Sequence, residues 1–280
     1  MSQKRIWTDE QQQEIIRLYT KEGLTMAEIA KKYATKHTQI SSILHAHGIP
    51  VKKVRHKNRL LKEDYFSEID TEQKAYFLGL MLTDGAVVKD NKGERQDTIS
   101  LELVETDVEI INKFKKEINS NSSLYFNKRK NRDKGTYTLS FRSNQMSNDL
   151  SKYGIVQNKT YITEHLPQIP EEFMVPFIRG IIDGDGSLYF SGNCWHCSIT
   201  SYSENILNEL QSEISQRIGK TNTLKIYNAG KVGTHRLTYN HYDTLKIVEV
   251  FYKNNNISIA RKNAIANRIL EEDKRVEDIV

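Results

Sequence analysis

The 280-residue sequence has no apolar run near the ~20 residues that a membrane-spanning helix requires, so no transmembrane segment is expected. Cysteine is scarce: the chain has two, Cys194 and Cys197, which excludes a disulfide framework and is typical of a reducing cytoplasm. Their Cys-Trp-His-Cys spacing resembles half of a zinc site, but the other half is absent. In a strand the two thiols would also point to opposite faces. The polar, charged N-terminus is not typical of a secretory signal, so a cytoplasmic protein is favoured.

Positive charge is concentrated near the N-terminus of a chain whose formal net charge is +5. Residues 1–62 hold 13 Lys/Arg against 5 Asp/Glu, whereas the remaining residues hold 28 against 31. A basic segment of this kind is typical of a module that contacts phosphate groups. The alternative is a solvated basic tail, but this segment also carries a regular apolar pattern.

The apolar pattern of residues 8–50 predicts three short helices. Thr8 and Thr25 are the expected N-caps of the first two, and the third is expected over 37–47. Three short helices with a tight turn between the last two resemble a helix-turn-helix of the resolvase-like kind. The resemblance implies a DNA-binding domain over residues 1–50. A small helical protein-interaction domain is the alternative.

The resemblance makes the third helix the element that reads DNA. Gln39 and Ser42 are expected to hydrogen-bond base edges, and Lys36 at the start of the helix is expected to contact phosphate. A basic linker is expected over 51–69, and its basic residues include Lys52, Lys53 and Arg55. This linker either follows a groove of the DNA or stays solvated, and the sequence favours neither.

Two similar stretches stand 101 positions apart in the rest of the chain. Phe77–Gly85 reads FLGLMLTDG and Ile178–Gly186 reads IRGIIDGDG, so each is an apolar, helix-length run that closes on Asp-Gly. An aspartate at the negative, C-terminal end of a helix costs about 0.3–1 kcal/mol. An ordinary Asp-Gly turn would explain one copy, but the matching pair suggests two carboxylates held together for chemistry, Asp84 and Asp185.

The same order of elements follows each stretch. Each copy begins with the apolar helix, over 72–84 or 171–184, and continues with two strands, a helix, two strands and a helix. A final helix is expected over 258–273. A repeat of about 100 residues is too long for a solenoid and indicates two duplicated halves related by a pseudo-two-fold axis. The halves are expected over 70–163 and 164–280.

The paired Gly-x-x-x-x-Asp-Gly helices, each followed by strand pairs and two helices, resemble the two-motif, single-chain LAGLIDADG homing endonucleases over residues 70–275. The resemblance implies an α+β fold in which an αββαββα half is used twice and two sheets form a saddle over the DNA major groove. It also implies that the motif helices pack side by side and that their ends reach the minor groove, where the strands are cut. Gly79 and Gly180 would let the two backbones approach closely. Gly85 and Gly186 are expected in the left-handed conformation that ends each helix.

Asp84 and Asp185 would then face each other, and two carboxylates at close range repel unless a cation lies between them. Mg²⁺ prefers oxygen ligands and keeps several waters, so Mg²⁺ is expected at this pair, with Mn²⁺ or Ca²⁺ able to occupy the same sites. The preceding acidic position of the family is Asp183 in the second copy but Leu82 in the first. Asp183 is therefore interpreted as a structural or helper residue.

The resemblance also implies one basic residue from each half that stabilises charge at phosphorus, located just after the last helix of the repeat. Lys159 and Lys262 match this position. They lie 103 residues apart, which is close to the 101 that separates the two aspartates. An ordinary surface lysine near a loop is the alternative at each position.

Basic residues on the strands and hairpins are expected to contact the DNA backbone or bases. The densest cluster lies at a predicted hairpin tip and comprises Lys128, Arg129, Lys130 and Arg132. Further expected contacts from the two sheets are Arg142, Lys225 and Arg236.

The expected function is that of a monomeric, Mg²⁺-dependent endonuclease that makes a double-strand break in a long, specific DNA site. One alternative on the same fold is a DNA-binding regulator that no longer cuts, which the retained Asp84 and Asp185 do not favour. Another is a maturase that binds its own intron RNA, and nothing in the sequence separates this role from the nuclease. The expected location is the cytoplasm of a bacterial or phage-infected cell, or an organelle matrix.

Overall fold

The computed structural model describes residues 7–51, 60–128, 133–220, 224–229 and 233–277. The chain divides into two compact units, one within Met1–Lys57 and one within Asn58–Val280. Six basic residues expected to contact DNA lie outside the described residues: Lys52, Lys53, Arg55, Arg129, Lys130 and Arg132.

In its described residues, the N-terminal unit has three short helices, α1 (Asp9–Thr20), α2 (Met26–Lys32) and α3 (His37–Ala46). Thr8 and Thr25 begin the first two as capping boxes: each side-chain oxygen accepts a backbone N–H three residues later, and the side chain of Gln11 or Glu28 returns the bond. The apolar faces meet in a small core of Ile15, Leu18, Ile29, Ala30, Ile40, Ile43 and Leu44. That this unit is a helix-turn-helix DNA-binding domain stays a prediction.

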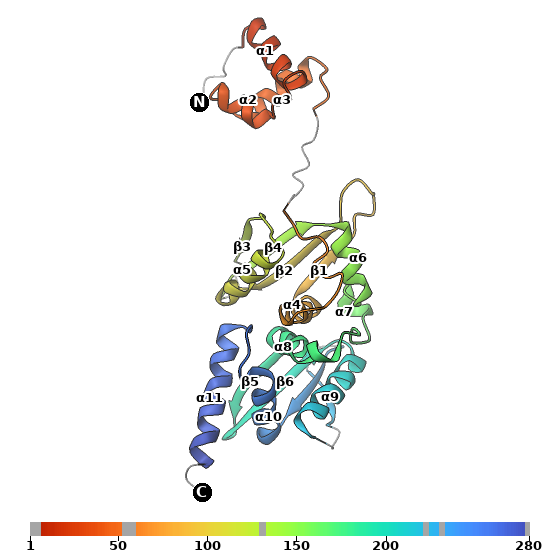
Figure 1. The fold of residues 1–280 in the computed structure, drawn as a ribbon, viewed down its shortest axis with the longest axis vertical. Coiled ribbons are helices and arrows are strands. Elements are labelled where there is room, and N and C mark those ends of the chain that lie inside the picture. The colour runs from red at the N-terminus through yellow and green to blue at the C-terminus, as the bar shows by residue number, and fades with distance from the viewer. Residues whose placement is uncertain (1–6, 52–59, 129–132, 221–223, 230–232, 278–280) are drawn as a thin grey trace. The chain divides into compact units, whose positions relative to one another are not determined.

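The larger unit repeats one order of elements, as Figure 1 shows. The first half runs α4 (Glu72–Thr83), β1 (Gly85–Val88), β2 (Thr98–Val104), the 3₁₀ turn η1 (Glu105–Asp107), α5 (Val108–Glu117), β3 (Leu124–Asn127), β4 (Thr136–Arg142), α6 (Asn144–Lys152) and α7 (Lys159–Ile162). The second runs η2 (Glu171–Phe173), α8 (Met174–Asp185), β5 (Gly186–Ser191), β6 (Cys194–Ser201), α9 (Glu204–Ile218), β7 (Ile226–Asn228), β8 (His235–Tyr239), α10 (His241–Tyr252) and α11 (Ala260–Glu277). The fold is therefore α+β, and the order αββαββα occurs twice in it.

In the residues that the structure describes, each half contains one antiparallel four-stranded sheet. The strand orders are β1-β2-β4-β3 and β5-β6-β8-β7, and the first ladders open on the equivalent pairs Gly85–Leu101 and Gly186–Ile199. Alternation along each strand turns one face toward the helices and leaves the other accessible. The core also takes in the end of the predicted linker over 51–69, because four of its residues are buried there: Leu61, Tyr65, Phe66 and Ile69.

The helices α4 and α8 pack against each other at the junction of the two halves (Figure 1). A Cβ added to Gly79 would lie 2.2 Å from the carbonyl oxygen of Phe177, and a Cβ added to Gly180 would lie 2.2 Å from that of Tyr76. A side chain at either position would force the helices apart. The two glycines therefore lie at the close helix contact that the sequence predicts.

The expected left-handed conformation of Gly85 and Gly186 is wrong. Gly186 is extended, with φ −87° and ψ 164°, and Gly85 has no positive φ. Glycine is needed here for another reason: each strand leaves so close to the preceding helical turn that a Cβ would lie 2.5 Å from the Met81 carbonyl oxygen or 2.4 Å from that of Ile182.

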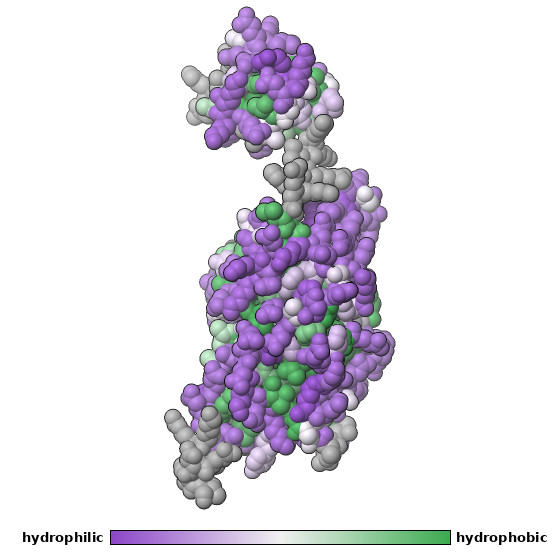
Figure 2. All heavy atoms as spheres, in the orientation of Figure 1, coloured by the Kyte–Doolittle hydropathy of each residue, from purple (hydrophilic) through white to green (hydrophobic). Residues whose placement is uncertain are grey.

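None of the described helices combines the length and the apolar character that a membrane span requires. Figure 2 shows hydrophilic residues over most of the visible face, with apolar residues gathered in smaller patches.

Candidate active site

The C-terminal ends of α4 and α8 bring Asp84 and Asp185 into one region. Asp84 is the C-cap of α4, and its backbone N–H donates to the carbonyl oxygen of Leu80 at 2.9 Å. Asp185 is the last residue of α8. A Cβ added to Gly184 would lie 2.0 Å from Thr83 Oγ1 and 2.7 Å from Asp84 Oδ2, so the end of α4 touches the backbone beside Asp185.

Gly184 is thus a required residue that the sequence analysis missed. The signal was present in the second motif, which reads Asp-Gly-Asp-Gly where the first reads Leu-Thr-Asp-Gly. The extra glycine stands at the position where the second helix end meets the side chains of the first.

The two aspartates share an unfavourable electrostatic environment. Burial and the Asp84 charge together raise the pKa of Asp185 to about 6, with burial as the larger cause, although Lys159 and Lys262 act in the opposite direction. Burial also raises the pKa of Asp84, against a 3.1 Å hydrogen bond from the Thr83 hydroxyl and the same two lysines. Asp185 is exposed and Asp84 is partly buried, so the pair is crowded by protein yet open to solvent. Such a pair gains from a bound cation.

Lys159 lies beside this pair, at the start of α7. Its Nζ donates to the Thr83 carbonyl oxygen at 2.9 Å, and the side chain is buried. Burial lowers the pKa of Lys159, and the charges of Asp185 and Asp84 oppose that shift. Lys159 and Asp185 line one cavity of about 230 Å³, together with Ser201 from the end of β6.

Lys262 reaches the end of α8 from α11. Its Nζ donates to three carbonyl oxygens, those of Ile182 and Asp183 at 2.6 Å and that of Gly186 at 2.7 Å. Burial lowers the pKa of Lys262 to about 8, although the Asp183 charge opposes the shift. Both predicted lysines therefore lie at the helix ends that carry the aspartates, but their hydrogen bonds differ.

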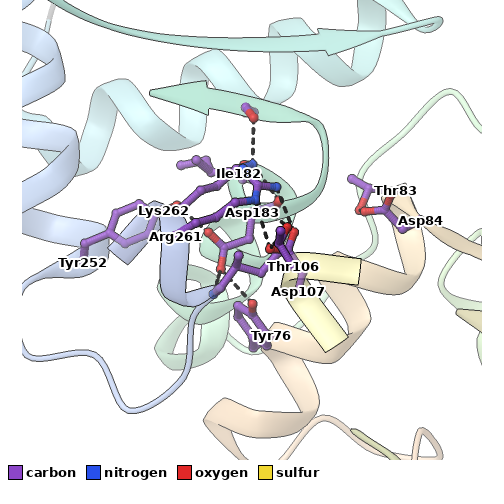
Figure 3. A network of polar contacts seen from close by, with 12 residues as sticks. Tyr76, Thr83, Asp84, Thr106, Asp107, Ile182, Asp183, Tyr252, Arg261 and Lys262 are labelled. Atoms are coloured by element: carbon purple, nitrogen blue, oxygen red, sulfur yellow. Dashed lines mark hydrogen bonds and ion pairs between the residues drawn. The ribbon is translucent and has the colours of Figure 1, made fainter. Parts of the chain in front are cut away.

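The side chain of Asp183 belongs to a separate buried network (Figure 3). It accepts hydrogen bonds from the hydroxyls of Tyr76 and Tyr252 at 2.7 Å and from the Ile259 backbone N–H at 2.6 Å. These bonds tie α4, α8, α10 and the approach to α11 together. Asp183 therefore has a structural environment, whereas Leu82, its counterpart in the first copy, is apolar.

The donor set at the helix ends fits a hard divalent cation. In the parts of the chain that the structure describes, no three His, Cys, Asp or Glu residues are grouped closely enough to hold a metal ion by themselves. Mg²⁺ uses one or two carboxylates, keeps several waters and binds phosphate oxygens of a substrate. Two carboxylates with raised pKa, Asp84 and Asp185, match this requirement, whereas Cys194 and Cys197 are free thiols, the second of them buried.

The predicted reading residues of α3 have partners within their own unit. Gln39 accepts a hydrogen bond from the Thr35 hydroxyl, and the Ser42 hydroxyl donates to the Thr38 carbonyl oxygen at 3.0 Å. Lys36 and Ser42 are exposed and Gln39 is partly buried. The side chains of Gln39 and Ser42 keep further hydrogen-bonding capacity toward solvent.

Four predicted contact residues of the larger unit are exposed: Lys128, Arg142, Lys225 and Arg236. Arg142 and Arg236 lie on central strands of their sheets, β4 and β8. The sheet register adds a row that the sequence analysis missed, because Tyr125, Thr138 and Glu102 are cross-strand neighbours on one accessible face. The Thr138 hydroxyl donates to Glu102 Oε2 at 2.9 Å. Strand alternation in the sequence predicts which side chains share a face, but only the strand register shows which of them are neighbours.

No family model matches this chain, and no curated protein is similar to it in sequence. Solved structures of homing endonucleases are similar to it in fold at low identity. The structure of I-DmoI with DNA and Ca is 14% identical, over 70% of this chain and 97% of that one, with a TM-score of 0.48. The LAGLIDADG meganuclease I-CpaMI bound to uncleaved DNA is 11% identical, over 73% and 92%, with a TM-score of 0.48. The LAGLIDADG homing endonuclease I-LtrWI bound to target DNA is 13% identical, over 78% and 92%, with a TM-score of 0.47.

Proposed function

We propose that this protein is a site-specific DNA endonuclease of the LAGLIDADG type that makes a double-strand break in a long target. One chain carries both halves, so it acts as a monomer with one aspartate from each half. The reaction adds water across a P–O ester bond of each strand: the hydroxyl joins phosphorus and the proton goes to the leaving sugar oxygen.

One observation carries the proposal. Two helices that touch through Gly79 and Gly180 end in Asp84 and Asp185, and Asp84 Oδ2 lies 2.7 Å from the position of a Cβ at Gly184. A purely structural turn has no need for two crowded carboxylates whose pKa values are raised. Perturbed acids at a solvent-open junction are typical of a catalytic or metal-binding role.

Asp84 and Asp185 would hold Mg²⁺, and Mn²⁺ or Ca²⁺ could occupy the same positions. When bound, the cation supplies Lewis acidity and lowers the pKa of a bound water. The chain itself orients Asp84 through the Thr83 hydroxyl. It also holds the positive charge of Lys159 beside Asp185, where charge on a phosphate would develop.

Double-stranded DNA is the proposed partner, with contacts spread over the sheets and the N-terminal unit. Phosphate contacts would come from Lys36, Lys128, Arg142, Lys225 and Arg236, and from the basic residues that lie outside the described ranges. Base contacts of α3 would come from Gln39 and Ser42. Many weak contacts of this kind add up to recognition of one long site.

The test begins with selection of cut duplexes from a randomised DNA library in the presence of Mg²⁺. The recovered duplex is then digested by the wild type, by Asp84→Asn, by Asp185→Asn and by the double variant. We expect double-strand cuts from the wild type, a loss of at least about 100-fold in each single variant and no cutting by the double variant. Asp70→Asn is the matched control, since Asp70 is an exposed aspartate before the start of α4 that pairs with Lys74.

Two results would contradict the proposal. Tight, specific DNA binding by the wild type without a cut in Mg²⁺, Mn²⁺ or Ca²⁺ identifies a regulator. Wild-type cutting rates in the double variant exclude the two aspartates from the chemistry.

A further inference from the structure

We propose that the two cutting centres of this protein are chemically unequal, with Lys159 facing the substrate at the centre that cuts first and Lys262 acting as a positioning residue at the other. This inference rests on the proposed function and assigns different roles to two lysines that the sequence places equivalently. We call Lys159, Asp185 and their shared cavity the Lys159 centre, and Lys262, Arg261 and Asp107 the Lys262 centre.

The ammonium group of Lys262 has no hydrogen left for a substrate. It carries three donors, and all three are directed at carbonyl oxygens, those of Ile182, Asp183 and Gly186. Asp183 and Gly186 enclose the segment that carries Asp185. Lys262 therefore fixes the backbone at the end of α8 and the start of β5, and its role is to position this segment, not to contact a phosphate.

The ammonium group of Lys159 is differently engaged. Among the described residues it makes one hydrogen bond, to the Thr83 carbonyl oxygen, so two of its three donors remain. The cavity of about 230 Å³ that it lines with Asp185 has room for several waters. Thr83 and Ser201 are also among its lining residues, so polar residues lie around such waters.

Next to Lys262 the second cation of that centre is also engaged within the protein. Arg261 Nε lies 3.0 Å from both oxygens of Asp107, and its Nη2 lies 2.9 Å from Oδ2. Asp107 is buried and belongs to η1 of the other half. A cavity of about 220 Å³ lies beside this ion pair, and in the described part of the chain its lining includes neither Lys262 nor Asp84.

These differences predict an order of events. A phosphate at the Lys159 centre meets an available ammonium group and a cavity that holds water. A phosphate at the Lys262 centre meets an ammonium group whose three hydrogen bonds are already made to protein atoms, beside an Arg261 guanidinium that is paired with Asp107. The strand at the Lys159 centre is therefore cut first, and the nicked duplex is the obligatory intermediate.

The experiment uses the full chain and the duplex recovered by the selection described above, with each strand labelled separately. The wild type should cut the same strand first in every turnover. Lys159→Met should slow that first cut by about 100-fold or more and Lys159→Arg should restore most of it, because arginine keeps a charged donor at the cavity. Lys262→Met and Lys262→Arg should both slow cutting. Methionine has no donor, and the planar guanidinium of arginine cannot donate to all three carbonyl oxygens, which lie in different directions around the ammonium group.

A second measurement needs no DNA. Thermal unfolding should show Lys262→Met at least about 4 °C below the wild type, because three buried carbonyl oxygens lose a donor, whereas Lys159→Met should lie much closer to the wild type. Equal rate constants for both strands of the wild type would overturn the inference. So would full cutting activity in Lys262→Arg, or equal slowing of both strands in Lys159→Met. If the wild type cuts neither strand, the proposed function itself fails. Equal thermal shifts in Lys159→Met and Lys262→Met would separately contradict the structural role assigned to Lys262.

Discussion

Tyr76 on α4 donates its hydroxyl to Asp183 on α8 at 2.7 Å, in the interior of the larger unit and 107 residues away in sequence. Both residues are almost completely buried. Asp183 accepts two further bonds, from Tyr252 and Ile259, and burial raises its pKa. The junction of the two halves is thus fixed by a polar network as well as by the glycine contact.

Removing one donor from this network should destabilise the fold without touching the cutting centres. Tyr76→Phe keeps the ring and leaves the Asp183 carboxylate with one fewer partner, so we expect a loss of about 1–3 kcal/mol in the free energy of unfolding. Urea unfolding measures it. Tyr242→Phe is the control, since Tyr242 is 76% exposed and its variant should unfold at the wild-type midpoint. A Tyr76→Phe midpoint equal to the control would show that the network contributes little.

The glycine contact between α4 and α8 predicts a larger loss. Alanine is the better helix former, and by propensity alone Gly79→Ala would gain about 1 kcal/mol. The added Cβ, however, would meet a carbonyl oxygen at 2.2 Å, so we expect a net loss of at least about 2 kcal/mol in urea unfolding.

The matched control for Gly79→Ala is Gly219→Ala. Gly219 has φ +67° and open space around it, so its variant isolates the backbone strain of about 1–2 kcal/mol without a clash. A stabilising Gly79→Ala would exclude the close helix approach.

The sequence predicted the fold well because the strongest signals were repeated. Each motif appeared twice at the same spacing, so the helix contact at Gly79 and Gly180 and the order of elements followed from comparing the copies. The prediction for Gly85 and Gly186 failed because an Asp-Gly pair indicates a turn but not its dihedral angles. The close approach of a strand to the preceding helical turn is a tertiary feature that local sequence does not contain.

The site was only partly predictable for a related reason. The family resemblance implied one basic residue from each half near the aspartates, and the spacing selected Lys159 and Lys262. Their hydrogen-bond partners, however, depend on how α7 and α11 pack against the helix ends. The Arg261–Asp107 ion pair joins residues 154 positions apart, and no pattern in either segment indicates the other. Pairs of this kind are determined by packing of the two halves.

The raised pKa of Asp185 predicts a pH-dependent stability difference. An acid with a higher pKa in the folded state binds its proton more tightly when folded, so stability falls as the pH rises from the ordinary value of 3.8 to about 6 and then stays lower. Asp185→Asn removes this loss. Without divalent cations, its midpoint in urea relative to the wild type should therefore rise between pH 4 and 6 and remain level up to pH 8.

Asp70→Asn provides the opposite trend as a control. A hydrogen bond from Lys74 lowers the pKa of the Asp70 carboxyl, so any effect of the substitution should be small and of reversed sign. A difference between Asp185→Asn and the wild type that is constant with pH would mean that Asp84 and the protein around it do not perturb Asp185.

The same repulsion predicts that a divalent cation stabilises the folded protein in the absence of DNA. A ligand that binds only the folded state at 100 times its Kd adds about 2.7 kcal/mol to the free energy of unfolding. We therefore expect Mg²⁺ at pH 8 to raise the thermal midpoint of the wild type and of Asp70→Asn, and EDTA to reverse the rise. Asp84→Asn and Asp185→Asn should respond much less, because each leaves one carboxylate for the cation and removes the charge repulsion that binding relieves. An equal rise of the thermal midpoint in all four proteins would show that the cation binds away from Asp84 and Asp185. The close approach of these two carboxylates would then not be explained by cation binding.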